Sequence, residues 1–150
     1  MNLALIFAGG TGTRMNSKTK PKQFLELNGK PIIIHTIELF ESHPEIDAIA
    51  VVCLESWIGY LNELLERFRI TKVKYVVPGG ETGQQSIRNG LTAFWDDQDI
   101  PRDSLVLIHD GVRPLINEDI ITRSIECAKQ YGNAITVTPA IETIITVSED

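Results

Sequence analysis

The chain has 150 residues, which is the length of one ordinary domain, so we expect a single folding unit over residues 1–150. Its residues are 43% hydrophobic and 23% charged, values typical of a globular protein, and no apolar run is long enough to span a membrane. The formal net charge of −6 disfavours broad binding to nucleic acid or to anionic lipid, because those surfaces need a basic excess. Any phosphate site in this chain must therefore be local.

Five short apolar or β-branched runs have the length of strands that are buried on both faces of a sheet. The first run lacks the basic region and the length of a signal peptide, so we expect a cytoplasmic protein. A sixth candidate strand is Thr143–Val147. The five runs are Leu3–Phe7, Ala48–Leu54, Lys74–Val77, Leu105–Ile108 and Ala134–Val137.

Helical patterns separate these runs. Strands that alternate with helices require right-handed crossover connections, which give a mostly parallel sheet. We therefore expect an α/β protein with three layers, α/β/α, around a Rossmann-like, doubly wound sheet. Ligands of such sheets bind beyond the carboxyl ends of the strands. The predicted helices are Ile32–Glu41, Trp57–Phe68, Gln84–Phe94 and Glu118–Tyr131.

A loop rich in glycine follows the first predicted strand. Its small residues let backbone N–H groups approach an anion and curl around it. The dinucleotide-binding pattern fails because Met15 occupies the third glycine position, and the P-loop pattern fails because Ser17 stands where a glycine belongs. The loop is therefore a phosphate-binding candidate of another kind. It comprises Ala8, Gly9, Gly10, Thr11, Gly12 and Thr13.

Basic residues continue this loop. Arg14 and Lys22 are the candidates for neutralising a triphosphate, whereas Lys18 and Lys20 are better explained as solvated lysines. A second loop, from Pro78 to Ser86, joins a predicted strand to a predicted helix and offers polar groups for a base or a ribose. Thr82 or Gln84 in that loop has the alternative role of capping the helix.

A third group of polar residues follows the strand Leu105–Ile108. Asp110 comes at the carboxyl end of this strand, where it is a candidate Mg²⁺ ligand, and Arg113 is a candidate for clamping a phosphate. The structural alternative makes Asp110 a turn cap with Arg113 as its surface partner. His109 points to the other side of the strand, so we interpret it as a core or supporting histidine.

Five linked motifs together resemble the methylerythritol-phosphate and ribitol-phosphate cytidylyltransferases, over the whole chain. The resemblance implies a fold of the nucleotidyltransferase type that lacks its C-terminal part in this chain, and a full-length homodimer. The motifs are Ala8-Gly9-Gly10 with Arg14-Met15, Pro21-Lys22-Gln23-Phe24-Leu25, Gly29-Lys30-Pro31, Gly79-Gly80 with Ser86, and His109-Asp110 with Arg113-Pro114.

The resemblance also implies roles. CTP would donate its cytidylyl group to 2-C-methyl-D-erythritol 4-phosphate or ribitol 5-phosphate, serving isoprenoid or teichoic-acid-type polymer synthesis. Arg14 and Lys22 would stabilise the charge at the α-phosphate, and Asp110 would bind Mg²⁺ as cofactor. The nucleotide loops would contribute Gly80, Glu81 and Ser86 besides the first loop, and the acceptor would contact Asp110, Arg113 and Thr143.

Three alternatives stay open. The base and acceptor preferences are open. Many family members carry Asp followed by Glu-Arg where this chain has Glu81-Thr82-Gly83, and Asp-Thr where it has Glu142-Thr143.

Two other functions are also open. A sugar-phosphate uridylyl- or guanylyltransferase would share the glycine-rich loop, and a catalytically silent nucleotide-binding module would explain the altered residues Glu81-Thr82-Gly83. Three features, namely Phe24, Trp57 and the run from Ile32 to Glu38, are slightly more similar to the pentitol-phosphate branch. We expect weak or absent activity from residues 1–150 alone.

Overall fold

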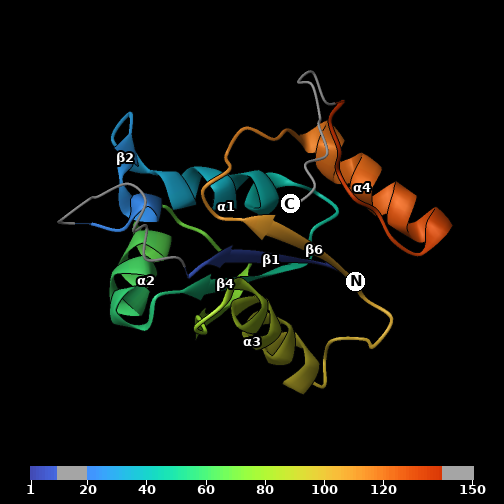
Figure 1. Cartoon of the computed structure of the whole chain (residues 1–150), viewed down its shortest axis with the longest axis horizontal. Helices are drawn as coiled ribbons and strands as arrows, with labels where there is room; N and C mark the ends of the chain where they lie inside the picture. The colour runs from blue at the N-terminus through green and yellow to red at the C-terminus, as the bar shows by residue number, and fades with distance from the viewer. Residues whose placement is uncertain (10–19, 140–150) are drawn as a thin grey trace, which may run out of the picture.

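The protein is built on a parallel sheet, seen in a computed structural model that describes residues 1–9 and 20–139. Every strand pair of this sheet is parallel, as predicted. The chain steps outward from β1 to β4 and β5, and then returns to the other side of β1 to form β6 (Figure 1). The sheet is therefore doubly wound, and its order reverses beside β1. Its strands, in the order β5-β4-β1-β6, are Val73–Pro78, Ala48–Cys53, Asn2–Ala8 and Leu105–Asp110.

Helices cover both faces of the sheet. Helices α1 (Ile32–Ser42), α2 (Ile58–Arg67) and α4 (Glu118–Tyr131) share one apolar cluster with the sheet, while α3 (Gly83–Asp96) packs on the opposite face. Figure 1 shows α1 and α4 above the sheet and α3 below it. These helices confirm the predicted three-layer fold, with ends within two residues of the predicted ones.

The central strands are apolar throughout because both of their faces are buried. Along β1, Ala4 and Ile6 belong to the cluster under α1, α2 and α4, whereas Leu3 and Leu5 belong to the cluster under α3. Successive side chains of a strand point to opposite faces, so each face receives every second residue. This is why a continuous apolar run, rather than an alternating one, predicted the strand.

Short elements connect β1 to α1. A 3₁₀ helix, η2, spans Lys22–Phe24, and a small hairpin pairs β2 (Glu26–Leu27) with β3 (Lys30–Pro31). The hairpin turns at Asn28 and Gly29, whose φ angles of 52° and 75° suit a two-residue turn of the I′ type. A further 3₁₀ helix, η3 (Glu55–Trp57), precedes α2. The sequence predicted no strands here, because two residues are too few for a periodicity.

The predicted strand Ala134–Val137 is wrong. Residues 133–139 have no regular structure, and the side chains of Ile135 and Val137 are 83% and 82% exposed. A strand forms only where a neighbour accepts its backbone hydrogen bonds, and none of the described strands pairs with this segment. The segment instead lines a groove with α4 and β6. The candidate strand Thr143–Val147 lies outside the described residues.

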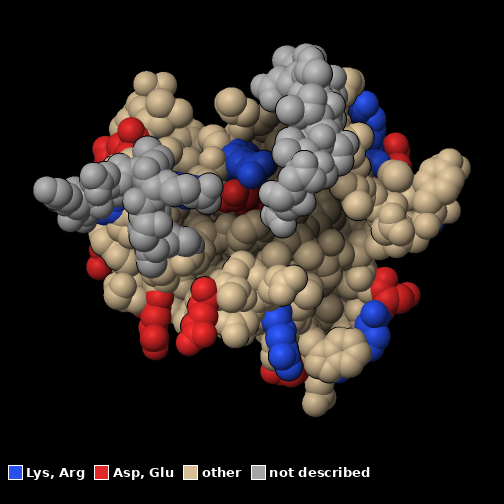
Figure 2. All heavy atoms as spheres, in the orientation of Figure 1, with Lys and Arg blue, Asp and Glu red and all other residues tan. Residues whose placement is uncertain are grey.

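The face drawn in Figure 2 shows no broad basic area among its described residues. On the face drawn in Figure 2, acidic and basic side chains are interspersed among neutral ones. Among the described helices, none combines the length and the apolar character that a membrane span requires.

Candidate functional site

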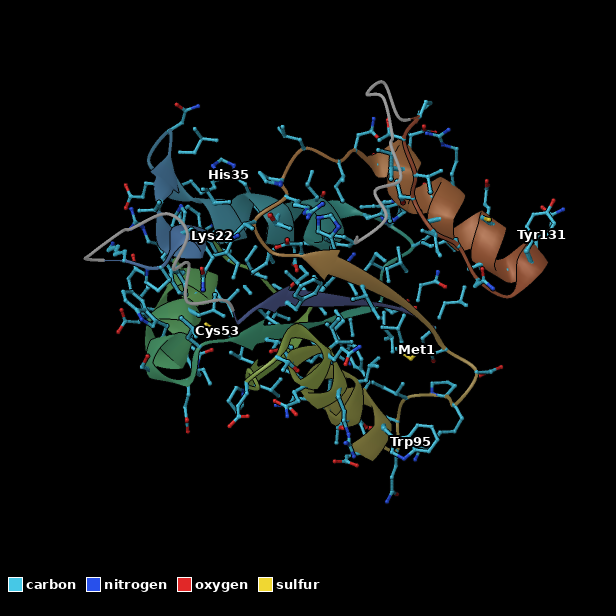
Figure 3. All side chains as sticks on the ribbon, in the orientation of Figure 1. Met1, Lys22, His35, Cys53, Trp95 and Tyr131 are labelled. Atoms are coloured by element: carbon cyan, nitrogen blue, oxygen red, sulfur yellow. The ribbon has the colours of Figure 1, made fainter. Side chains whose placement is uncertain are left out.

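The carboxyl ends of the strands bring three of the predicted motifs together. In the register of the sheet, Ala8 of β1 pairs with Cys53 of β4, Cys53 pairs with Pro78 of β5, and Phe7 pairs with Asp110 of β6. The segments that follow these residues therefore leave the sheet at one edge. In Figure 3, Lys22 and Cys53 lie toward this end of the molecule, whereas Met1 and Trp95 lie toward the other.

Small residues allow the loops after β1 and β5 to touch. A Cβ atom on Gly79 would lie 3.3 Å from the Cα atom of Gly9, and one on Gly9 would lie 3.1 Å from Oγ of Ser86. A side chain at either glycine would therefore force its neighbours to shift by a few tenths of an ångström. Gly9, Gly79 and Ser86, which the sequence placed in two separate motifs, thus form one continuous surface.

The first part of this loop, from Gly79 to Thr82, satisfies its own backbone donors. Four successive N–H groups are bonded within the protein, so this loop is not a nest of free donors for a phosphate. Gly79, Gly80 and Glu81 therefore offer a ligand their backbone carbonyls, and Glu81 also offers its exposed side chain. The four bonds run from Gly79 to Cys53 O (2.8 Å), from Gly80 to Ser86 Oγ (3.0 Å), and from Glu81 and Thr82 to Gln85 Oε1 (2.8 and 3.3 Å).

Thr82 caps helix α3. Its hydroxyl accepts from the N–H of Gln85 at 3.1 Å. The side-chain oxygen of Gln85 in turn accepts from the N–H of Thr82, which completes a capping box. This confirms the capping alternative for Thr82. The buried hydroxyl of Ser86 donates to Thr82 O at 3.0 Å while it accepts from Gly80. The hydroxyl proton of Ser86 is therefore engaged in the bond to Thr82 O. The two bonds of this hydroxyl stabilise the conformation of the loop.

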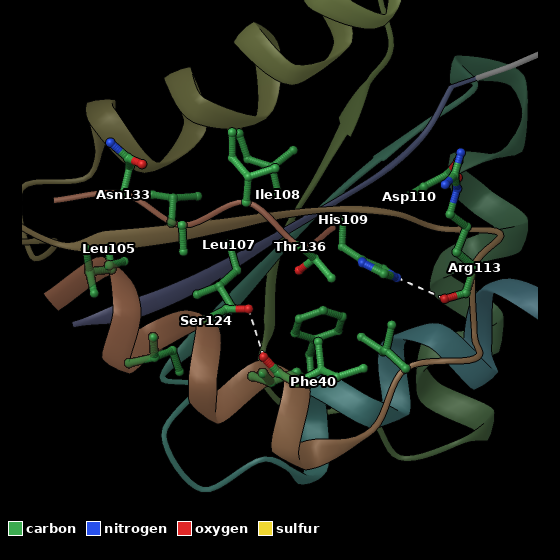
Figure 4. A pocket seen from close by; sticks show the side chains of 18 of the residues that line it. Phe40, Leu105, Leu107, Ile108, His109, Asp110, Arg113, Ser124, Asn133 and Thr136 are labelled. Atoms are coloured by element: carbon green, nitrogen blue, oxygen red, sulfur yellow. Dashed lines mark hydrogen bonds and ion pairs between the residues drawn. The ribbon is translucent and has the colours of Figure 1, made fainter. Parts of the chain in front are cut away.

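Asp110 and Arg113 face each other across a tight turn. One carboxylate oxygen of Asp110 accepts from the N–H of Val112 and the other from Nε of Arg113, both at 3.1 Å. The structure therefore has the geometry of the structural alternative, in which Asp110 caps the turn and Arg113 is its surface partner. The two side chains are 25% and 77% exposed, so the pair remains accessible to a ligand. Asp110 and Arg113 lie at one end of the groove in Figure 4.

This turn is fixed against the start of the glycine-rich loop. The N–H of Gly111 donates to Phe7 O at 3.0 Å, and a Cβ atom on Gly111 would lie 2.9 Å from Cβ of Ala8. His109 lies on the other face of β6, as predicted, where its Nε2 is 3.0 Å from Arg113 O and its ring is 5.3 Å from that of Phe40. Figure 4 shows the contact to Arg113. His109 thus supports the turn.

Sequence reasoning missed two buried polar side chains at this edge. Gln23 is 1% exposed and donates from Nε2 to Ala8 O at 2.7 Å. Thr36 is fully buried on α1 and donates from Oγ1 to Gly111 O at 3.0 Å. A threonine inside the apolar run of α1 could have indicated a buried hydroxyl that needs a hydrogen-bond acceptor. Nothing in the sequence around Gln23 indicated that its amide is buried.

Part of the predicted site lies outside the described residues, namely Gly10, Thr11, Gly12, Thr13, Arg14 and Thr143. Lys22 is described, is half-buried, and opens the 3₁₀ helix η2. Within residues 1–9 and 20–139, no group of three or more His, Cys, Asp or Glu side chains could hold a metal by itself. Asp110 supplies a single accessible carboxylate, which fits an ion that takes its other ligands from phosphate and water.

A model of the family described as IspD, 2-C-methyl-D-erythritol 4-phosphate cytidylyltransferase, matches residues 2–150. The chain belongs to this family. It is 59% identical over 150 residues to a ribitol-5-phosphate cytidylyltransferase of Vibrio parahaemolyticus and 56% identical over 149 residues to one of Streptococcus agalactiae. It is 43% identical over 133 residues to a 2-C-methyl-D-erythritol 4-phosphate cytidylyltransferase of Clostridium botulinum, covering 89% of this chain and 56% of that protein.

Solved structures agree with the fold. The crystal structure of the Francisella tularensis 2-C-methyl-D-erythritol 4-phosphate cytidylyltransferase superimposes with a TM-score of 0.69 at 28% identity, over 99% of this chain and 62% of that one. The matches to the Vibrio and Streptococcus proteins cover 100% and 99% of this chain and 62% of each relative. The chain therefore spans about three fifths of the length of the curated relatives it matches most fully.

Proposed function

We propose that the protein containing this chain transfers a cytidylyl group from CTP to ribitol 5-phosphate. An oxygen of the acceptor phosphate attacks the α-phosphorus of CTP in line, the bond from the α-phosphorus to the bridging oxygen breaks, and pyrophosphate leaves. The products are CDP-ribitol and pyrophosphate, and no covalent enzyme intermediate is formed. The observation that carries the proposal is the convergence of Gly9, Gly79 and Asp110 at one edge of the sheet in a member of this family.

We call the loop from Gly79 to Ser86 the base loop, and its hydrogen bonding supports the choice of cytosine. Because the N–H groups from Gly79 to Thr82 are bonded internally, this part of the loop presents its carbonyl acceptors rather than donors to a base. Cytosine carries an amino donor at the position where uracil carries a carbonyl oxygen. A site of fixed backbone acceptors favours the donor and leaves uracil with an acceptor facing an acceptor.

The charged residues support transfer at the α-phosphate. Transfer of a phosphoryl-type group depends chiefly on positioning and on stabilising negative charge. In the proposal, Arg14 and Lys22 provide that charge stabilisation, Asp110 holds Mg²⁺, and Arg113 binds the acceptor phosphate. Mg²⁺, when bound, would neutralise part of the triphosphate charge. Arg113 already reaches Asp110 from an exposed position, so it can turn to a ligand without crossing the core.

The choice of acceptor rests on the relatives. Two proteins that are 59% and 56% identical carry the ribitol name, while the methylerythritol relative is 43% identical. Phe24 and Trp57, which resembled the pentitol branch, are stacked in a packing cluster with ring centroids 5.0 Å apart. Their role is therefore to hold η2 rather than to touch the acceptor. Thr143 completes the proposed acceptor site, and the full-length protein is proposed to be a cytoplasmic homodimer.

The test is a paired acceptor assay on the full-length protein. CTP and Mg²⁺ are supplied with ribitol 5-phosphate or with 2-C-methyl-D-erythritol 4-phosphate, and pyrophosphate release is followed together with ³¹P spectra of the products. We expect CDP-ribitol with the first acceptor and at least about tenfold lower kcat/KM with the second, a difference of the size that one specific contact supplies. The reverse preference would assign the protein to the methylerythritol branch. Absence of pyrophosphate with both acceptors would refute cytidylyl transfer.

A further inference from the structure

The side chain of Gln23 joins two parts of the site that are far apart in the sequence. It is 1% exposed, and its Nε2 donates to the carbonyl oxygen of Ala8 at 2.7 Å across 15 residues. Ala8 is the last residue of β1 and the first residue of the glycine-rich loop. Gln23 is the middle residue of η2, directly after Lys22. The bond therefore ties the backbone that carries Lys22 to the point where the glycine-rich loop leaves the sheet.

Phe24, the residue that follows Gln23, is also held in place by packing. The ring of Phe24 is fully buried, stacks on Trp57 at 5.0 Å and meets the edge of Tyr60 at 5.4 Å. Trp57 and Tyr60 belong to η3 and α2, which follow β4. Phe24 thus fastens η2 to the layer of helices, while Gln23 fastens it to the sheet.

A second function of the bond is to satisfy the carbonyl of Ala8, which would otherwise be a buried acceptor at a strand end. That role alone needs only a donor, and water or a backbone N–H would serve. A side-chain amide adjacent to Lys22 does more, because it fixes the distance between η2 and β1. Groups that stabilise a transition state are effective only when they are held in place before the reaction, and a displacement of about 1 Å costs on the order of 10²-fold in rate.

We propose that Gln23 is a positioning residue that sets Lys22 against the nucleotide phosphates by bonding Ala8. The inference rests on the proposed role of Lys22 in cytidylyl transfer. Gln23 itself does not touch substrate. Its loss changes where Lys22 lies, and leaves the fold and the base loop intact.

The test compares Gln23→Met with the wild type in the full-length protein. Methionine keeps the length of the side chain and removes the donor. We expect kcat to fall by about 10- to 100-fold while the Kd for CTP stays within a few-fold. Amide hydrogen exchange at Phe24 and Leu25, whose N–H groups bond Pro21 O and Lys22 O, is expected to quicken, because η2 is released from the sheet.

The matched control is Thr122→Val. The hydroxyl of Thr122 bonds Nε2 of the buried His43 at 3.0 Å, near the start of β1 and away from the site. This variant also removes one interior side-chain bond, so it shows how much of any loss comes from stability alone. It is expected to lower the melting temperature without changing kcat or the exchange rates at Phe24 and Leu25.

The variant Gln23→Glu adds a readout that a merely structural role would not move. A neutral carboxylic acid can donate to Ala8 O, whereas a carboxylate cannot. Its kcat relative to the wild type should therefore rise as the pH falls. The proposal is overturned if Gln23→Met matches Thr122→Val in kcat or in exchange at Phe24 and Leu25. A wild type without cytidylyl transfer would count against the proposed function, and the exchange rates would then decide the positioning role by themselves.

Discussion

Gly90 of α3 lies directly on the side chain of Leu5 of β1. A Cβ atom on Gly90 would be 2.6 Å from Cδ1 of Leu5 and 2.9 Å from Cγ2 of Val52. Both of these side chains are fully buried in the cluster beneath α3, so neither can move aside. The absence of a side chain at Gly90 therefore lets α3 approach the sheet and brings the base loop, which precedes α3, over the end of β1.

Gly90→Ala is expected to lower the free energy of unfolding by about 1–3 kcal/mol, the usual cost of forcing extra volume into a packed core. The matched control is Gly83→Ala in the same helix, where a Cβ atom would meet nothing within 4 Å. This control should be neutral or stabilising by up to about 1 kcal/mol, because alanine favours the helix. Urea denaturation of both variants checks the pair, and equal free energies would contradict the packing described.

Arg14→Ala in the full-length protein is expected to lower kcat by roughly 10²–10³-fold while the Kd for CTP stays within a few-fold. The reason is that a cation at the α-phosphate interacts with charge that develops only during the transfer. Single-turnover rates and equilibrium titration with CTP measure the two effects separately. Lys18→Ala is the control, because Lys18 is interpreted as a solvated lysine. An unchanged kcat in Arg14→Ala would remove Arg14 from the transition state.

The two thiols are expected to react at different rates. Burial raises the pKa of Cys53 to about 11, although a hydrogen bond from the backbone of Leu54 lowers it in part. Cys53 is fully enclosed, whereas Cys127 is half-buried on α4. The native 150-residue chain should therefore take up one equivalent of a thiol reagent at pH 8, and a second only in denaturant. Cys127→Ser should abolish the fast reaction, and rapid uptake of two equivalents would contradict the burial of Cys53.

The carboxylate of Glu41 is expected to contribute stability that is lost in acid. Burial raises its pKa, but hydrogen bonds from the Thr71 hydroxyl and from the backbone N–H groups of Lys72 and Thr71 outweigh burial and lower the pKa overall. A lowered pKa stabilises the fold above the ordinary carboxyl range, and the contribution disappears as the pH falls through the lowered value.

Glu41→Gln should therefore unfold more easily than the wild type at neutral pH, and the difference should shrink below about pH 4, where the unfolded carboxyl is protonated. Glu63→Gln, at an exposed position of α2, is the control and should follow the wild type at every pH. Thermal unfolding between pH 3 and pH 7 measures the trend. A difference that grows in acid would have the wrong sign for a lowered pKa.

The sequence predicted the central strands and the long helices because the pattern of their apolar residues indicates which faces of each element are buried. Leu3, Leu5, Ala4 and Ile6 are apolar on both sides of β1, and the structure buries both sides. Ala134–Val137 is likewise rich in apolar and β-branched residues but is largely exposed. Such residues indicate a strand but not whether a partner strand is present. The pairing partner is a property of the tertiary structure.

The candidate site was predictable where position in the fold decides the role. Asp110 follows a predicted strand, so its place at the carboxyl edge followed from the topology. The hydroxyl of Ser86 was not predictable in detail, because its donation to Thr82 O depends on the shape of the loop. The tie from Gln23 to Ala8 O was missed for a related reason. Whether a glutamine is buried depends on neighbours that are distant in the sequence.

The most direct test of the account is a titration of the ¹⁵N-labelled chain with CTP and, separately, with UTP, followed by amide chemical shifts in the presence of Mg²⁺. We expect CTP to bind more tightly than UTP. The largest shifts should occur at the residues gathered at the carboxyl edge of the sheet, namely Ala8, Gly80, Glu81 and Asp110. Equal affinity for the two nucleotides, or shifts confined to the opposite edge around Trp95 and Arg102, would contradict this expectation.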